Sequence, residues 1–170
     1  MKKKSQAEQV FVFMVAIILA ALILLYGYKA IFGKEGLLKR TEQISLTNFE
    51  SKISSSIKSI SYNPGDVRLM NFDVPSKYKK VCFVQLNYPN KQSSGICQSE
   101  NQNYNPVICN AWTTEGNKQN VFFVPMADIP IYVSTLEITA GYLCVPVNSG
   151  TISLKLEGMG DRTKISELSS

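Results

Sequence analysis

The sequence contains no histidine among its 170 residues. This absence excludes acid–base catalysis by an imidazole, the serine and cysteine triads that depend on one, and zinc sites with histidine ligands. The aspartates and glutamates are dispersed, with neither the spacing of an EF-hand loop nor an evident catalytic pair. We therefore expect no enzymatic activity, no metal and no cofactor.

Charge is also absent from a long stretch near the start of the chain. From Val10 to Tyr28, 19 residues pass without a charge, between Lys2–Lys4 and Lys29. As a helix this run would measure about 28 Å, close to the roughly 30 Å hydrocarbon thickness of a bilayer. A cleaved secretory signal is the alternative, but its apolar core is usually about 7–15 residues long and ends at a small-residue site. The longer run, with Tyr26 and Tyr28 suited to an interfacial aromatic belt, favours a retained transmembrane helix.

The rest of the sequence divides into regions of different composition. Three of the lysines behind the net charge of +5 stand at the N-terminus, where they act as a topology signal, so we expect no nucleic-acid partner. Gly33 and Gly36 bracket a short basic segment. We expect a basic leader at 1–9, a transmembrane helix at 10–32, a hinge or linker at 33–46 and a head domain at 47–170.

Four cysteines, Cys82, Cys97, Cys109 and Cys144, all follow the apolar run. An even number in an exported domain indicates disulfides, and four cysteines allow three pairings. We favour Cys97–Cys109, which would close a polar loop, and Cys82–Cys144, which would join two apolar strand-like segments. The alternatives are four buried thiols in a cytoplasmic domain and, less favoured because no C-x-x-C pair occurs, a four-cysteine zinc site.

The charges beside the apolar run do not fix its orientation. Three lysines precede the run and four basic residues follow it closely, a nearly balanced count under the positive-inside rule. The cysteines favour a head domain outside the cell, as does the segment 87–120, which is dense in Asn, Gln and Ser.

A second helix is predicted after the hinge. Thr47 and Glu50 have the spacing of a capping box, so we expect this helix to begin near Thr47 and to end before the turn at 63–65. Apolar residues recur on one face every three or four positions. We expect this stripe to pack on the head's own sheet; packing against neighbouring subunits is the alternative. The stripe consists of Leu46, Phe49, Ile53, Ile57 and Ile60.

From Asp66 onward the patterns are those of β-strands. The clearest is TISLKLEG, in which Ile152, Leu154 and Leu156 alternate with polar residues. Gly158 and Gly160 lack the spacing of a phosphate-binding loop, so we interpret GMGDRT as a tight turn into a last strand. The other predicted strands are DVRLMNFDV, KKVCFVQLN, PVICNAW, NVFFVPM, IYVSTLEI and YLCVPV. A helix followed by strands without intervening helices predicts an α+β fold with an antiparallel, sandwich-like sheet arrangement.

Two aromatic residues are candidates for recognition. Trp112 is the only tryptophan; we expect a core ring, with a binding hot spot as the alternative. Tyr104 lies among polar residues between Cys97 and Cys109. We expect a solvated loop there, with a recognition surface as the alternative.

The N-terminus resembles that of the archaeal type IV prepilins. The residues that carry the resemblance are KKKSQAE at 2–8, running directly into the apolar segment. It implies cleavage between Ser5 and Gln6 by a prepilin peptidase, with the apolar segment kept as a filament core. The chain differs from the family in having Ser5, where Gly or Ala usually precedes the cut. It also has Val10 where members often carry Glu, the nearest acid being Glu8.

Two functions follow as hypotheses. The first is a structural subunit, pilin-like or a minor pilin, held in the membrane or assembled into a surface filament with other such subunits. Phe11, Phe13 and Leu19 would then contact neighbouring helices. The second is an uncleaved single-pass membrane protein whose disulfide-stapled extracellular head binds a partner.

Overall fold

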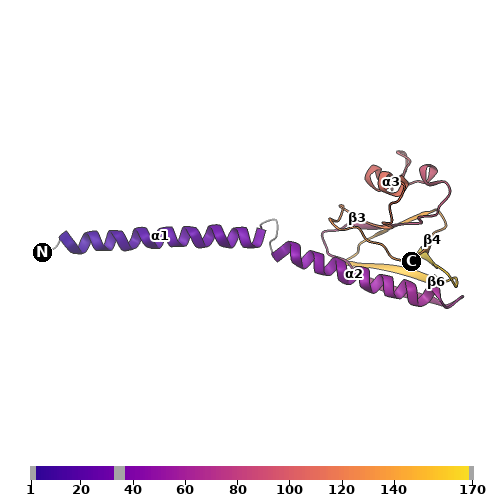
Figure 1. The fold of residues 1–170 in the computed structure, drawn as a ribbon, viewed down its shortest axis with the longest axis horizontal. Helices are drawn as coiled ribbons and strands as arrows, with labels where there is room; N and C mark the ends of the chain where they lie inside the picture. Colours follow the sequence, from indigo (N-terminus) through magenta and orange to yellow (C-terminus); the bar gives the residue numbers. More distant parts are fainter. Residues whose placement is uncertain (1–2, 33–36, 169–170) are drawn as a thin grey trace. The chain divides into compact units, whose positions relative to one another are not determined.

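The computed structural model describes the backbone of residues 3–32 and 37–168 (Figure 1), and within these ranges it leaves out the side chains of 3–9, 31 and 37–39. Contacts along the chain divide it after Ile44 into two compact units, Met1–Ile44 and Ser45–Ser170. The second unit is the head domain. Each unit is described separately.

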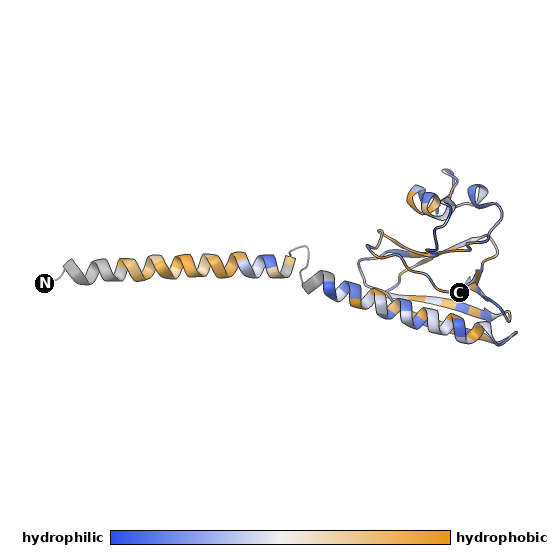
Figure 2. Ribbon diagram, in the orientation of Figure 1, coloured by the Kyte–Doolittle hydropathy of each residue, from blue (hydrophilic) through white to orange (hydrophobic). Residues whose placement is uncertain are grey.

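The first unit contains helix α1, Lys3–Phe32. Its apolar colouring is continuous over the middle of the helix and gives way to white and blue near the C-terminal end (Figure 2). Leu, Ile, Met and Ala dominate this stretch, and no proline interrupts it, so the backbone can remain helical throughout. The helix begins at Lys3, so residues 3–9, predicted as a separate leader, belong to the same helix as the apolar run.

Helix α2, Leu37–Ser61, begins well before Thr47. The predicted start was wrong because LLKRTEQI at 37–44 consists largely of good helix formers and contains neither glycine nor proline. Thr47 and Glu50 therefore lie inside the helix and do not form a capping box. The part of the predicted hinge from Leu37 to 46 is helical, and the glycines at 33 and 36 lie outside the described residues.

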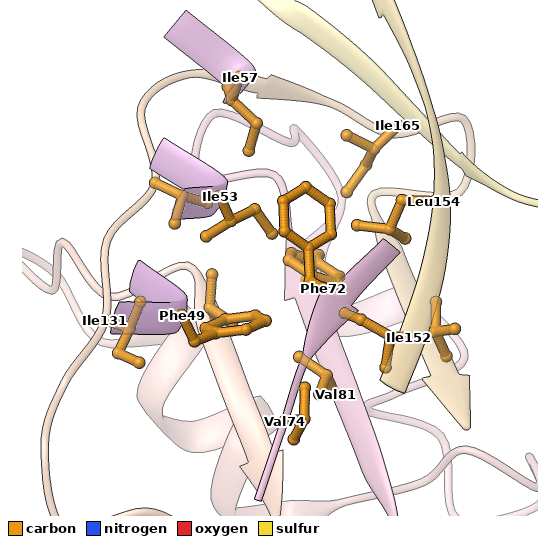
Figure 3. Close-up of a cluster of buried hydrophobic side chains, with 14 of the residues drawn as sticks. Phe49, Ile53, Ile57, Phe72, Val74, Val81, Ile131, Ile152, Leu154 and Ile165 are labelled. Atoms are coloured by element: carbon orange, nitrogen blue, oxygen red, sulfur yellow. The ribbon is translucent and has the colours of Figure 1, made fainter. Parts of the chain in front are cut away.

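The apolar face of α2 packs on the head's own strands, as predicted. All five residues of the stripe are at most 2% exposed. Phe49 meets the rings of Phe72 and Phe123 at 6.3 Å and 5.3 Å between centroids, both edge to face. Figure 3 shows Phe49, Ile53 and Ile57 directed toward Phe72 and the side chains of neighbouring strands. We call the buried cluster that this face of α2 forms with strand residues such as Phe72, Phe123, Ile152, Leu154 and Leu156 the main core.

Two sheets complete the head. All paired neighbours among the described strands are antiparallel except β4 and β7, which are parallel. The four-stranded sheet has the order β1-β6-β7-β4, with β1 Val67–Asp73, β6 Thr151–Gly158, β7 Thr163–Glu167 and β4 Leu136–Glu137. The three-stranded sheet has the order β3-β2-β5, with β3 Val121–Val124, β2 Lys80–Val84 and β5 Tyr142–Pro146. This arrangement confirms the α+β class and the antiparallel-rich sheets.

The three-stranded sheet is covered on both faces. In β2, Val81 and Phe83 enter the main core, whereas Cys82 and Val84 enter a second cluster on the opposite face. That cluster, which we call the cap core, comprises Cys82, Val84, Ile96, Ile108, Trp112 and Phe122. It is closed by the cap, the segment 85–120, which contains the short 3₁₀ helix η1 Lys91–Ser93 and helix α3 Pro106–Thr113. Figure 1 shows α2 and α3 on opposite sides of β3.

The segment PVICNAW, predicted as a strand, forms most of α3. Asn105 caps this helix, since its side-chain oxygen accepts hydrogen bonds from the backbone N–H groups of Val107 and Ile108, both at 3.1 Å. Pro106 occupies the first turn, where its missing N–H costs nothing. A cap residue followed by proline is a helix-start signal, and it outweighs the β-branched residues in the segment. The strand predicted for IYVSTLEI was too long, because only Leu136–Glu137 forms a strand in that segment.

The β6–β7 hairpin was predicted correctly, and it holds the end of α2. Burial alternates along β6, with Ile152, Leu154 and Leu156 inside. A Cβ on Gly158 would overlap the carbonyl oxygens of Ile60 and Asn63, so only glycine permits this approach. The Gly160 N–H donates to the Ser61 carbonyl at 2.8 Å. The glycines thus form a tight turn that packs against the helix end.

Candidate functional site

The first candidate surface is the apolar part of α1. The span Val10–Ala30 has 21 residues, none of them buried. At about 1.5 Å per residue it measures roughly 31 Å, which matches a bilayer core. A helix that is apolar on all sides needs apolar surroundings, either lipid or other helices. The span is therefore long and apolar enough to cross a membrane, and an export signal can share that property.

The predicted anchor and assembly residues lie on this surface. Phe11, Phe13 and Leu19 are 68%, 63% and 54% exposed. Tyr26 and Tyr28 are also exposed near the C-terminal end of the apolar span, and the Tyr28 ring lies 5.0 Å from that of Phe32. Exposed apolar side chains around the whole helix could contact acyl chains or neighbouring helices with equal ease.

The predicted processing residues lie at the beginning of α1. Ser5, Gln6 and Glu8 fall within the helix, but their side chains are outside the described residues. Cleavage between Ser5 and Gln6 stays a prediction.

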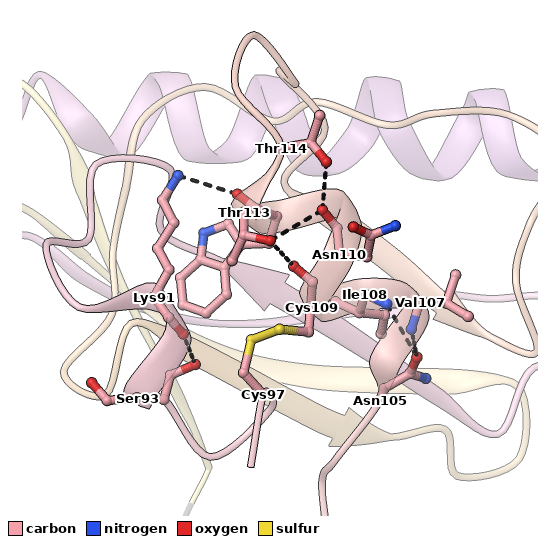
Figure 4. Close-up of a disulfide and its surroundings, with 12 residues drawn as sticks. Lys91, Ser93, Cys97, Asn105, Val107, Ile108, Cys109, Asn110, Thr113 and Thr114 are labelled. Carbon is pink, nitrogen blue, oxygen red and sulfur yellow. Dashed lines mark hydrogen bonds between the residues drawn. A yellow bond between two sulfur atoms is a disulfide. The ribbon is translucent and has the colours of Figure 1, made fainter. Parts of the chain in front are cut away.

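The second candidate surface is the disulfide-stapled cap of the head. The structure pairs Cys97 with Cys109 and Cys82 with Cys144, the pairing favoured from the sequence. Cys97–Cys109 joins the loop before α3 to the helix itself (Figure 4). Cys82 lies opposite Cys144 on the neighbouring strands β2 and β5. The cap is therefore fixed to itself by one disulfide, and the sheet beneath it is cross-linked by the other.

Trp112 is a core residue of the cap, which confirms the first of its two interpretations. It is 1% exposed, and its Nε1–H donates to the Gln85 carbonyl at 3.0 Å. Tyr88 stacks on it at 6.1 Å, and the Lys91 ammonium donates to its carbonyl oxygen at 3.2 Å. A buried and fully bonded indole has no free surface for a partner, so the hot-spot alternative is wrong.

Tyr104 is accessible on the cap. Its side chain is 43% exposed, and Val107 on the first turn of α3 is 57% exposed. A recognition role for this surface stays a hypothesis.

A cleft on the head was not predicted from the sequence. It has a volume of about 440 Å³, within the roughly 300–1,000 Å³ typical of small-ligand sites. It lies where β2 ends, β4 runs and β7 begins, so its walls come from segments far apart in the chain. Its polar lining includes Asn87, Tyr132, Ser134, Thr135, Glu137 and Arg162. No local motif unites these residues, and no single-segment signal could have found them.

Buried hydrogen bonds hold the walls of the cleft. Asn120, 1% exposed, accepts from the Val133 N–H and donates to the Ser134 carbonyl, both at 2.9 Å. The Gln85 side chain accepts from the Ile138 N–H at 2.9 Å. Polar groups buried with satisfied partners fix a loop in one conformation, so the cleft is preformed.

The described residues contain no group of three or more Cys, Asp or Glu side chains placed to hold a metal. The carboxylates that are close to other charges form ion pairs on the surface, such as Arg68 with Asp66 at 2.7 Å and Lys52 with Asp73 at 3.4 Å. Exposed pairs of this kind contribute about 0–1 kcal/mol each and point to no reaction.

Comparison of the chain with protein-family models, curated proteins and solved structures found no match. No matched family, relative or solved structure therefore supports the pilin resemblance.

Proposed function

We propose that the chain is a non-catalytic, membrane-anchored structural protein of the cell surface, with the head outside the cell. The observation that carries the proposal is the contrast between the two long helices. The apolar stripe of α2 is buried in the head's main core, whereas the apolar span of α1 has no buried residue. An apolar helix of this length requires a partner outside its own chain, either lipid or other helices.

The finer form of the proposal is a pilin-like subunit. Its support is the leader KKKSQAE followed at once by the apolar helix, together with a β-rich head that has its own core. Processing by a prepilin peptidase between Ser5 and Gln6 would place the new amino terminus at the start of the retained helix. Phe11, Phe13 and Leu19 would then contact copies of the same helix or related subunits.

The mature N-terminus tests this form directly. Mass spectrometry of the protein isolated from membranes should find a chain that begins at Gln6. Ser5→Leu, which replaces the small residue before the cut, should leave a chain that begins at the leader, whereas Ser45→Leu is the matched control and should be processed normally. A wild-type chain that begins at Met1 would rule out processing, and the absence of surface filaments by electron microscopy would then rule out a pilin.

The second candidate is the uncleaved single-pass protein with a binding head. The preformed cleft favours it, because a purely structural head needs no such site. Both candidates require the head outside the cell, and an impermeant thiol reagent tests that. After reduction with an impermeant phosphine, intact cells should be labelled at the half-buried Cys97 and Cys109, whereas Cys82, 2% exposed, is shielded inside the folded head. If labelling requires lysis, the head is cytoplasmic and both candidates are wrong.

A further inference from the structure

We propose that the cleft between β4, β7 and the end of β2 is a binding site for a neutral saccharide. The inference does not depend on whether α1 is an anchor or a filament core, because every residue involved belongs to the head. It starts from the side chains that the fold leaves available at this position.

Several polar groups in the cleft have no partner within the described part of the chain. The hydroxyls of Tyr132, Ser134 and Thr135 and the amide of Asn87 form no hydrogen bond with any of the described residues. Hydroxyl groups both donate and accept, and an amide offers two donors and a carbonyl. A ligand that matches them must carry several groups that also both donate and accept, which is the chemistry of a polyol.

The charges in the cleft argue against an ionic ligand. Arg162 Nε donates to the Glu137 carboxylate at 2.6 Å, and Arg162 Nη1 lies 3.4 Å from an Asp161 oxygen. The only cation in the lining is therefore already paired with one carboxylate and near a second, which leaves no excess positive charge for an anion. The Glu137 carboxylate is likewise paired, which weakens it as a cation ligand. The pair still presents planar donors and acceptors to a neutral hydroxyl.

Tyr132 supplies the apolar part of the site. Its side chain is 46% exposed on the cleft wall. A tyrosine ring combines an apolar face with a polar tip, and a sugar ring likewise has apolar C–H groups beside its hydroxyls. The ring would cover one face of the sugar while the polar side chains bind its edge.

The backbone beneath these groups is held in place, which lowers the cost of binding. The Asn120 side chain forms hydrogen bonds with the Val133 N–H and the Ser134 carbonyl. The backbone of Ser134, with a φ of 56°, is in the left-handed conformation. The Thr163 N–H donates to the Thr135 carbonyl at 3.2 Å, joining the same loop to β7. Groups held in position before binding lose little conformational freedom when the ligand arrives.

The test uses the full chain in lauryldimethylamine oxide, because maltoside and glucoside detergents would themselves occupy a saccharide site. The probes are immobilised neutral oligosaccharides of glucose, mannose, galactose and N-acetylglucosamine, with oligosaccharides of uronic acids as the charged comparison. Binding is then measured by calorimetry for the best neutral probe and for its monosaccharide, which separates a free sugar from a chain as the ligand. We expect at least one neutral probe to bind and the uronic acids to bind less.

Two variants assign the binding to the cleft. Tyr132→Ala should weaken it about tenfold, and Thr135→Val, which keeps the volume and removes the hydroxyl, about fivefold, as expected for one lost contact. Tyr104→Ala removes an equally exposed tyrosine from the cap and should leave binding within about twofold. Melting temperatures of all variants check that each is folded.

The proposal is overturned if no neutral probe binds, if the uronic acids bind more tightly, or if Tyr132→Ala and Thr135→Val both bind as the wild type does. A loss confined to Tyr104→Ala would also overturn it and would assign recognition to the cap.

Discussion

The packing of Phe49 gives the sharpest test of whether α2 belongs to the core of the head while α1 does not. Phe49 is 2% exposed and contacts two aromatic rings of the main core edge-on. Truncation of a buried phenylalanine to alanine costs about 3–5 kcal/mol, which includes the lost ring pairs. For a head of this size each kcal/mol lowers the melting temperature by about 3–5 °C, so Phe49→Ala should lower it by roughly 10–20 °C.

The matched control is Phe11→Ala, the same change on α1. Phe11 is 68% exposed, so its removal should change the melting temperature of the head by no more than about 2 °C. Unfolding is followed by fluorescence of Trp112, the only tryptophan, in detergent-solubilised full chain. Because Trp112 lies in the cap core and Phe49 in the main core, a coincident shift would also show that the two clusters unfold together.

Phe49→Leu provides a milder change, of roughly 1–2 kcal/mol, should the alanine variant fail to fold. The reasoning is refuted if Phe49→Ala shifts the melting temperature by less than about 4 °C, or if Phe11→Ala shifts it as much. The first result would mean that Phe49 does not contribute the packing energy that its burial implies, and the second that the stability of the head also depends on α1.

Three further predictions test other parts of the structure. Gly158→Ala should destabilise the head by about 1–3 kcal/mol, because the Cβ of the alanine would press on the carbonyls of Ile60 and Asn63. Ser166→Ala on β7 is the control. Equal melting temperatures of the two variants would contradict the close approach. Loss of Cys82–Cys144, with 62 residues of separation, should lower the free energy of unfolding by about 4 kcal/mol, and loss of Cys97–Cys109, with a separation of 12, by about 3 kcal/mol. Denaturant unfolding of the paired Cys→Ser variants measures both values. The reverse order would count against the loop-closure account. Leu19→Arg should reduce the amount of protein retained in the membrane, because insertion of an arginine at the centre of a membrane helix costs about 2.5–3.5 kcal/mol. Leu19→Ile is the control. Equal recovery of both variants in the membrane fraction would argue against insertion of α1.

The sequence predicted most reliably the features that one segment carries alone. The period of the α2 stripe and the alternation in β6 each depend on a single element with one buried face, and both were recognised. The disulfide partners followed from the same logic, since Cys82 and Cys144 stand at the centres of apolar segments that pair as strands. Charge-free length was likewise enough to identify α1.

The failures came where a local signal competed with composition. Ile108 and its neighbours suggested a strand, but Asn105 and Pro106 start a helix, and the turn chemistry prevailed. Thr47 and Glu50 have capping-box spacing within a segment that was already helical. The cleft was beyond single-segment reasoning, because Asn87, Thr135 and Arg162 meet only through the pairing of strands distant in sequence.

The strand β2 is apolar on both faces, and this has a consequence for how its sheet finds the correct alignment. Val81 to Val84 are all buried, so sliding β2 by one residue would exchange two apolar faces along most of the strand, and only at its ends would Lys80 or Gln85 move toward a buried position. Burial alone discriminates poorly between the native and the slipped arrangement. The bond between Cys82 and Cys144, which lie directly opposite each other, can form only in one of them. Oxidation therefore selects the native alignment of the strands, and a reduced head would lose a safeguard against misfolding as well as stability.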